Sequence, residues 1–155
     1  MAKTASRSAL LHVCVQDLHA GKTDFADRVP ALAGGARDPV LSRLLADQAE
    51  RAREQAERLR GLGADMAGPR NLWMAGILDD AERDAKSHEP GPLLDVALVG
   101  AMRKAKAADI VSGETALALA RALTLDHWVR ALDADRNEEI AADHALKERL
   151  VALSA

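Results

Sequence analysis

The chain has 155 residues, of which 48% are hydrophobic, 29% are charged and 2% are aromatic, with a formal net charge of −3. This length fits one domain, so we expect a single unit over residues 1–155, with about the first eight residues flexible. The scarcity of aromatic residues disfavours an all-β fold, and the abundance of Leu, Ala, Glu and Arg favours helices. The single cysteine, Cys14, excludes an internal disulfide and a thiolate zinc site.

The charge balance and the apolar runs exclude two further classes of partner. A net charge of −3 gives no support for binding to nucleic acid. No run approaches the roughly 18 apolar residues of a membrane span. The basic start of the chain is followed by His12 and Asp17, which makes a poor signal peptide. We therefore expect a cytoplasmic protein that binds neither membranes nor nucleic acid.

Proline and glycine divide the chain into helical segments. The expected segments, in chain order, are residues 5–32, 39–61 or 39–63, 71–86, 93–123 and 127–153. Pro30 predicts a kink or an early stop in the first segment. Asp38 followed by Pro39 is typical of a helix N-cap and a first-turn proline. Residues 124–126 predict a turn before the last segment.

Inward-facing residues in the long segments recur at spacings of three and four, which is typical of shallow-angle packing in a four-helix bundle. Charged residues interrupt these stripes near the middle of each helix. Lys22, Lys106 and Glu139 stand where leucine is expected, and Glu50 and Arg51 lie beside the stripe of the second segment. Each lysine taken alone could extend from the bundle edge into solvent. Because all four long segments carry polar residues at similar heights, we expect a central polar layer.

Short motifs along the chain match a known family in their order and spacing. They are Gln16-Asp17-Leu18 and Val29-Pro30 in the first segment, Gln55–Leu59 in the second, Met74–Ile77 in the short segment, Asp95–Leu98 before the third long segment, and Glu138-Glu139 in the last. Over about residues 10–153, the chain resembles the ferritin-like, stress-associated bacterial proteins of the YciE/YciF type. The resemblance implies an all-α, ferritin-like four-helix bundle, with an additional short helix between the second and third long helices.

Ferritin-like bundles bind two metal ions through carboxylates and histidines, and this sequence departs from the family at those positions. Lys22 replaces a family glutamate, Lys106–Asp109 replaces Glu-His-Tyr-Glu, and Gln48–Ala52 replaces His-Leu-Glu-Glu-Thr. Carboxylates remain at Glu50, Asp109, Glu138 and Glu139. Protonated lysines are not metal ligands, and they repel cations. We therefore expect no cofactor, and a layer in which Lys22, Lys106 and Arg51 balance Glu50, Asp109 and Glu139.

The leading hypothesis is a non-enzymatic, metal-free member of this family that acts in stress physiology or as an interaction scaffold. The stress role comes from the resemblance alone. We also expect a homodimer, which the apolar side chains of Trp73, Met74, Ile77 and Leu78 on the short helix would favour.

Two other functions stay open at this point. One is a metal-handling protein, oxidase or ferroxidase that binds iron or manganese; its candidate ligands are Glu50, Asp109, Glu138, Glu139 and His144. The other is a small-ligand module that uses space left by alanine and glycine in the bundle core. Metal content separates the first of these from the leading hypothesis.

Overall fold

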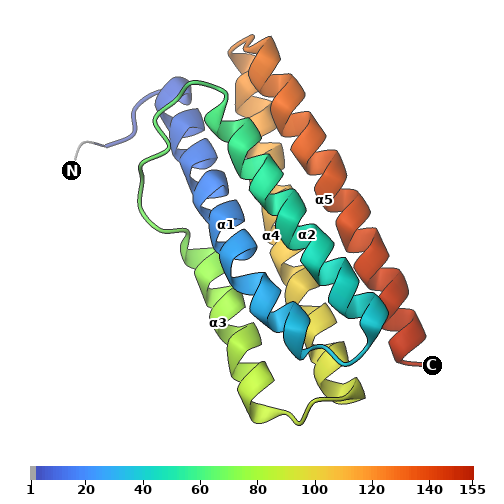
Figure 1. Cartoon of the computed structure of the whole chain (residues 1–155). Helices are drawn as coiled ribbons and strands as arrows, with labels where there is room; N and C mark the ends of the chain where they lie inside the picture. The colour runs from blue at the N-terminus through green and yellow to red at the C-terminus, as the bar shows by residue number, and fades with distance from the viewer. Residues whose placement is uncertain (1–2) are drawn as a thin grey trace.

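The structure, a computed structural model, describes residues 3–155, and these residues form α-helices without a β-strand (Figure 1). The helices are α1 (Arg7–Gly35), α2 (Pro39–Arg60), α3 (Leu72–Ser87), α4 (Pro92–Ala122) and α5 (Asp126–Leu153). The all-α class predicted from the sequence is therefore confirmed. In the described part of the chain, no helix combines the length and apolar character needed to cross a membrane.

The four long helices lie side by side, and the shorter α3 packs outside them against α1 and α4 (Figure 1). Helices α1 and α2 form one hairpin, and α4 and α5 form the other. The first helix starts at Arg7, after an N-cap at Ser6 whose hydroxyl oxygen accepts a hydrogen bond from the backbone N–H of Ala9. Residues 1–2 of the expected flexible start lie outside the described residues.

Side-chain caps define the starts of α2 and α3. A carboxylate oxygen of Asp38 accepts a hydrogen bond from the N–H of Leu41 at 2.8 Å, and the side-chain oxygen of Asn71 accepts one from the N–H of Met74 at 2.8 Å. Such caps satisfy backbone donors that have no partner within the helix. Asp38 is thus the N-cap that the sequence predicted, and Pro39 follows it in the first turn.

Pro30 neither ends α1 nor shortens it, so the predicted early stop is wrong. Proline has no N–H, which leaves the carbonyl oxygen of Ala26, four residues earlier, without its helical donor. A guanidinium N–H of Arg53 on α2 donates to this oxygen across 3.4 Å. The neighbouring helix therefore supplies a hydrogen bond that the proline cannot make, and α1 continues to Gly35.

The apolar core has two parts. One surrounds Phe25 and Leu98 toward the end where α1 joins α2, and the other surrounds Leu18 and Leu132 toward the opposite end. Along α1, Lys22 falls between Leu18 and Phe25, and thus between the two parts. The architecture therefore places a band of buried polar residues across the middle of the bundle.

Helix α3 is fixed to α1 at its N-terminal end. The side-chain amide of Asn71 donates to the carbonyl oxygen of Asp17 at 2.8 Å, and the indole N–H of Trp73 donates to the Asp17 carboxylate at 3.0 Å. Gly21 lies against this contact, because a Cβ there would come within 2.7 Å of the Asn71 amide nitrogen. The glycine allows the close approach of α3.

The apolar side chains of α3 do not form the exposed surface that the sequence suggested. Met74 and Leu78 are fully buried, and Trp73 and Ile77 pack against the core with only part of their surface exposed. The exposed apolar residue of this helix is Leu72, at 77%. The apolar stripe seen in the sequence is the face of α3 that packs against the core, so the prediction of an exposed surface is wrong.

A central layer of buried ion pairs

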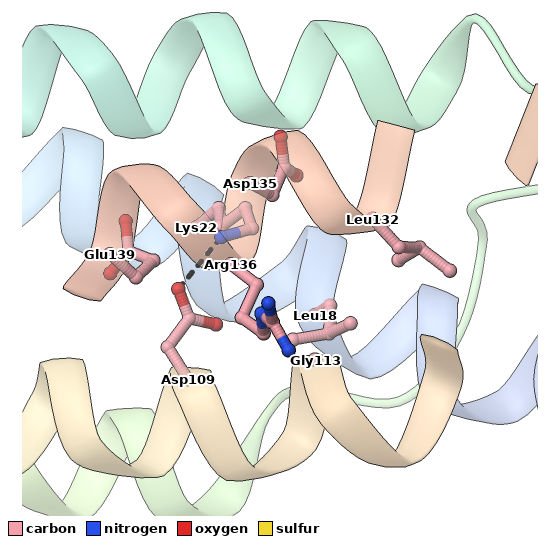
Figure 2. A pocket seen from close by; sticks show the side chains of 8 residues that line it. All are labelled: Leu18, Lys22, Asp109, Gly113, Leu132, Asp135, Arg136 and Glu139. Atoms are coloured by element: carbon pink, nitrogen blue, oxygen red, sulfur yellow. Dashed lines mark hydrogen bonds and ion pairs between the residues drawn. The ribbon is translucent and has the colours of Figure 1, made fainter. Parts of the chain in front are cut away.

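Lys22 is the centre of the polar layer (Figure 2). Its side chain is 3% exposed, and its ammonium group donates to Oδ2 of Asp109 on α4 at 2.7 Å. It donates a second hydrogen bond, of 3.0 Å, to the side-chain oxygen of Gln55 on α2. A buried charge is tolerated only when it is paired and hydrogen-bonded, and Lys22 meets both conditions.

Lys106, on α4, forms a second buried ion pair. Its Nζ lies 3.0 Å from Oε2 of Glu139 on α5, and both side chains are less than 5% exposed. The same ammonium lies 4.0 Å from the centre of the Phe25 ring on α1, where a cation is attracted by the face of the aromatic ring. The lysine is thus held by a carboxylate on one side and by a ring on the other.

A hydrogen-bonded chain extends from Lys22 through α2 to α5. The amide of Gln55 donates to Oε2 of Glu138 at 3.0 Å. The guanidinium of Arg58 donates to Oε1 of Glu138 at 2.9 Å, and it also pairs with Asp135. Together with the Lys22–Asp109 pair, these contacts connect one polar residue or more from every long helix.

The environment shifts the pKa values of these groups in different directions. Burial alone would lower the pKa of Lys22, but the negative charges of Asp109, Glu139 and Asp135 outweigh it and raise the pKa. Burial raises the pKa of Asp135 to about 6, despite the positive charges of Lys22 and Arg58. Lys22 is therefore a cation at neutral pH.

The carboxylates that face the lysines differ from one another. Burial raises the pKa of Asp109, and the nearby charge of Glu139 adds to this, although Lys22 opposes it. For Glu139, burial would raise the pKa, but Lys106 and Lys22 outweigh it and lower the pKa. Glu139 therefore stays ionised in mildly acidic solution, while Asp109 is the more easily protonated carboxylate.

The structure brings together Lys22 with Asp109 and Lys106 with Glu139, and it places other residues of the expected layer elsewhere. Glu50 and Arg51 lie on the exposed face of α2, where Glu50 is 3.6 Å from Arg53 and Arg51 is 3.1 Å from Glu54. Glu138 belongs to the layer through Arg58 and Gln55. His144 is exposed and lies 3.8 Å from Glu148, away from the layer.

Three members of the layer were not singled out from the sequence. Gln55 and Asp135 occupy stripe positions, which was a usable signal, because a polar residue there must find a buried partner. Arg58 lies outside the stripe and reaches the layer with a long side chain that keeps 32% of its surface exposed. No regular spacing distinguishes such a residue from an ordinary surface arginine.

The polar layer does not suit a pair of metal ions. Divalent cations need several free anionic oxygens, and here ammonium groups lie against Oδ2 of Asp109 and Oε2 of Glu139. Within residues 3–155, no three His, Cys, Asp or Glu side chains are grouped in a way that could hold a metal ion. The residues present therefore fit lysine ammonium groups as the cations of the layer.

These features define a class of protein: an all-α bundle of four long helices and one short helix, crossed at its centre by ion pairs. The chain belongs to the family described as a domain of unknown function, DUF892, whose model matches residues 6–154. The family match and the solved structures confirm the resemblance to YciE/YciF-type proteins.

Two solved structures share the fold over almost the whole chain. The stress protein YciF of E. coli has a TM-score of 0.92 and 20% sequence identity, covering 96% of this chain and 97% of its own. YcfI of Rhodopseudomonas palustris, provisionally described as a structural protein, has a TM-score of 0.88 and 26% identity, covering 94% and 95%. The comparison with curated proteins gives no match.

Proposed function

We propose that this protein is a non-enzymatic, ferritin-like four-helix bundle in which buried ion pairs stand where the YciE/YciF resemblance places two metal ions. The observation that carries the proposal is the contact of 2.7 Å between Nζ of Lys22 and Oδ2 of Asp109, with both side chains less than 5% exposed. The Lys106–Glu139 pair repeats the arrangement. A metal ion in the layer would have to displace these ammonium groups or lie beside them, against their repulsion.

The proposed role is that of an interaction scaffold in the cytoplasm, with a part in stress physiology and a homodimeric state. The name of the E. coli protein supports the stress role, and the description of the R. palustris protein supports the structural one. A centre of paired charges supports a scaffold, because breaking any one pair leaves an uncompensated buried charge. The bundle is thereby held in one arrangement.

Elemental analysis tests the metal-free centre. The protein is purified without a chelator from medium supplemented with iron and manganese. Lys22→Glu with Lys106→Glu restores a carboxylate set, and Lys104→Glu with Lys147→Glu changes the net charge equally at exposed positions. We expect no stoichiometric metal in the wild type or in the surface control, and more metal in the first double variant than in either.

Metal bound to the wild-type protein would indicate a different function. Two stoichiometric iron or manganese ions in the wild-type protein would contradict the proposal. They would favour the alternative, a metal-handling protein or ferroxidase that uses carboxylates of the layer such as Asp109, Glu138 and Glu139.

A further inference from the structure

A small cavity lies inside the polar layer, between α1, α4 and α5 (Figure 2). Its polar lining consists of Lys22, Asp109, Asp135, Arg136 and Glu139, and Gly113 also borders it. The space in it that is open to the centre of a water molecule is about 10 Å³. A volume of about 10–15 Å³ by this measure accommodates one water molecule. The cavity therefore takes one molecule of that size and nothing larger.

Four buried polar atoms on the lining residues have no hydrogen-bond partner among residues 3–155. They are Oδ1 of Asp109, Oδ2 of Asp135, Nε of Arg136 and Oε2 of Glu139. Oε2 of Glu139 lies 3.0 Å from the Lys106 ammonium, which leaves the other three atoms without a close partner. The two aspartate side chains are 4% and 6% exposed, so bulk solvent does not satisfy them. Figure 2 shows the second carboxylate oxygen of Asp109 turned away from Lys22, on the side where Arg136 lies. Buried polar atoms of this kind are expected to have a partner.

The three atoms define the chemistry of the occupant. Two carboxylate oxygens accept hydrogen bonds, and the N–H of Arg136 donates one, so the occupant must both donate twice and accept once. A metal or alkali cation cannot donate hydrogen bonds, and Lys22 and Arg136 repel it. An anion is repelled by the like charges of the Asp109, Asp135 and Glu139 carboxylates. A water molecule has the two donors and the acceptor that the three atoms require.

We propose that this cavity binds one water molecule, which donates to Oδ1 of Asp109 and Oδ2 of Asp135 and accepts from Nε of Arg136. The water completes a closed ring of contacts. Hydrogen bonds and ion pairs run from Asp109 through Lys22, Gln55, Glu138 and Arg58 to Asp135. The water joins Asp135 back to Asp109. The ion pairs on α1 and α4 are thereby tied to those on α2 and α5.

Gly113 offers a direct way to empty the site. It is buried in α4 and borders the cavity, yet a Cβ added to it would meet no atom within 4 Å. Gly113→Ala therefore adds a methyl group at the border of the cavity that reaches neither the water nor its partners. Gly113→Leu extends the side chain from this border toward the cavity and is the variant designed to displace the water. Gly100, on the same helix, also has no atom within 4 Å of an added Cβ and does not border the cavity. Gly100→Leu is the matched control for the change in helix propensity.

Crystal structures at atomic resolution and water magnetic relaxation dispersion test the proposal on the full chain. We expect one density peak at hydrogen-bond distance from the three atoms in the wild type, in Gly113→Ala and in Gly100→Leu, and none in Gly113→Leu. The number of long-lived internal waters should fall by one in Gly113→Leu alone. An empty wild-type cavity, a halide in it, or an unchanged water count in Gly113→Leu would overturn the proposal. A metal ion in it would overturn both this proposal and the proposed function.

Discussion

Lys22 and Lys106 determine what the centre of this bundle can do. Each supplies a positive charge inside the protein, and each lies against a carboxylate from another helix, at 2.7 Å and 3.0 Å. Ion pairs of this kind add little net stability compared with well-packed apolar residues. Removing one partner, however, leaves a buried charge unpaired, and the resulting loss of stability can be measured.

Lys106→Ala removes the ammonium group that faces Glu139 and leaves a buried carboxylate without its closest cation. We expect it to lower the free energy of unfolding by about 3–5 kcal/mol. Denaturant titration measures the change. Lys104→Ala, exposed on the same helix, is the control and should change stability by no more than about 0.5 kcal/mol. Equal losses for the two variants would show that the pair does not contribute as we describe.

The buried carboxylates also predict how stability depends on pH. Because burial raises the pKa of Asp135 to about 6, from its ordinary value of 3.8, the folded protein holds this proton more tightly than the unfolded chain. Asp109 shifts in the same direction. Their contribution to stability is therefore present at low pH and is lost as the pH rises through about 6. Glu139, whose pKa is lowered, contributes in the opposite sense and loses its stabilising effect as the pH falls below its ordinary value of 4.5.

Stability should consequently be highest in mildly acidic solution. We expect the free energy of unfolding to rise by about 1–3 kcal/mol when the pH falls from about 7 to about 5. Asp135→Asn should weaken this dependence, and Asp47→Asn, at an exposed position of α2, should leave it unchanged. Denaturant titrations across the pH range give the comparison. Wild-type stability that increases from about pH 5 to about pH 7 would contradict the raised pKa values of Asp135 and Asp109 as the dominant effect, over the lowered pKa of His19.

The inward positions of the two lysines could be predicted from the sequence, whereas the outward positions of Glu50 and Arg51 were missed. Lys22 and Lys106 occupy stripe positions, so helical periodicity alone turns them inward. Glu50 lies at the right height along α2, but it is about 200° around the helix from Gln48, at about 100° per residue. The prediction was right about the height of Glu50 along the bundle and wrong about the side of the helix from which it projects.

At the scale of the helices, local signals predicted the ends well and tertiary contacts decided the exceptions. Asp38 and Asn71 cap α2 and α3 through hydrogen bonds within three residues, which a sequence displays directly. Where α1 continues through Pro30, the carbonyl oxygen of Ala26 accepts a hydrogen bond from Arg53, a residue of another helix. No local sequence pattern predicts that contact.

The docking of α3 yields a prediction at Gly21. Gly21→Ala places a methyl group 2.7 Å from the side-chain nitrogen of Asn71, which is fully buried and caps α3. We expect a loss of about 1–3 kcal/mol, because crowding a packed contact outweighs the higher helix propensity of alanine. Hydrogen exchange should show faster exchange in α3 than in α5. Gly100→Ala serves as the control, and protection of α3 equal to that of the wild type would contradict the prediction.

At the scale of the whole molecule, the all-α class followed from composition, from Pro and Gly positions and from the spacing of apolar residues. The inward face of α3 could not be separated from a surface patch, because a short helix shows the same apolar spacing in both cases. Its side chains Met74 and Leu78 belong to the core.

The dimer remains a prediction, and Leu72 on α3 and Leu93 on α4 are apolar side chains exposed on the surface of the single chain. Light scattering at micromolar concentration should return twice the chain mass of 16.5 kDa. A species of the single chain mass at all concentrations would exclude a stable dimer.

The central claim is that two buried lysine ammonium groups provide the positive charge inside the bundle. Nitrogen-15 NMR of the lysine side chains tests it most directly, because a buried ammonium exchanges its protons slowly and a solvated one exchanges them fast. At neutral pH we predict two protected ammonium signals, one lost in Lys22→Arg and the other in Lys106→Arg. Ammonium signals for both residues that exchange as fast as those of exposed Lys104 and Lys147 would contradict the account.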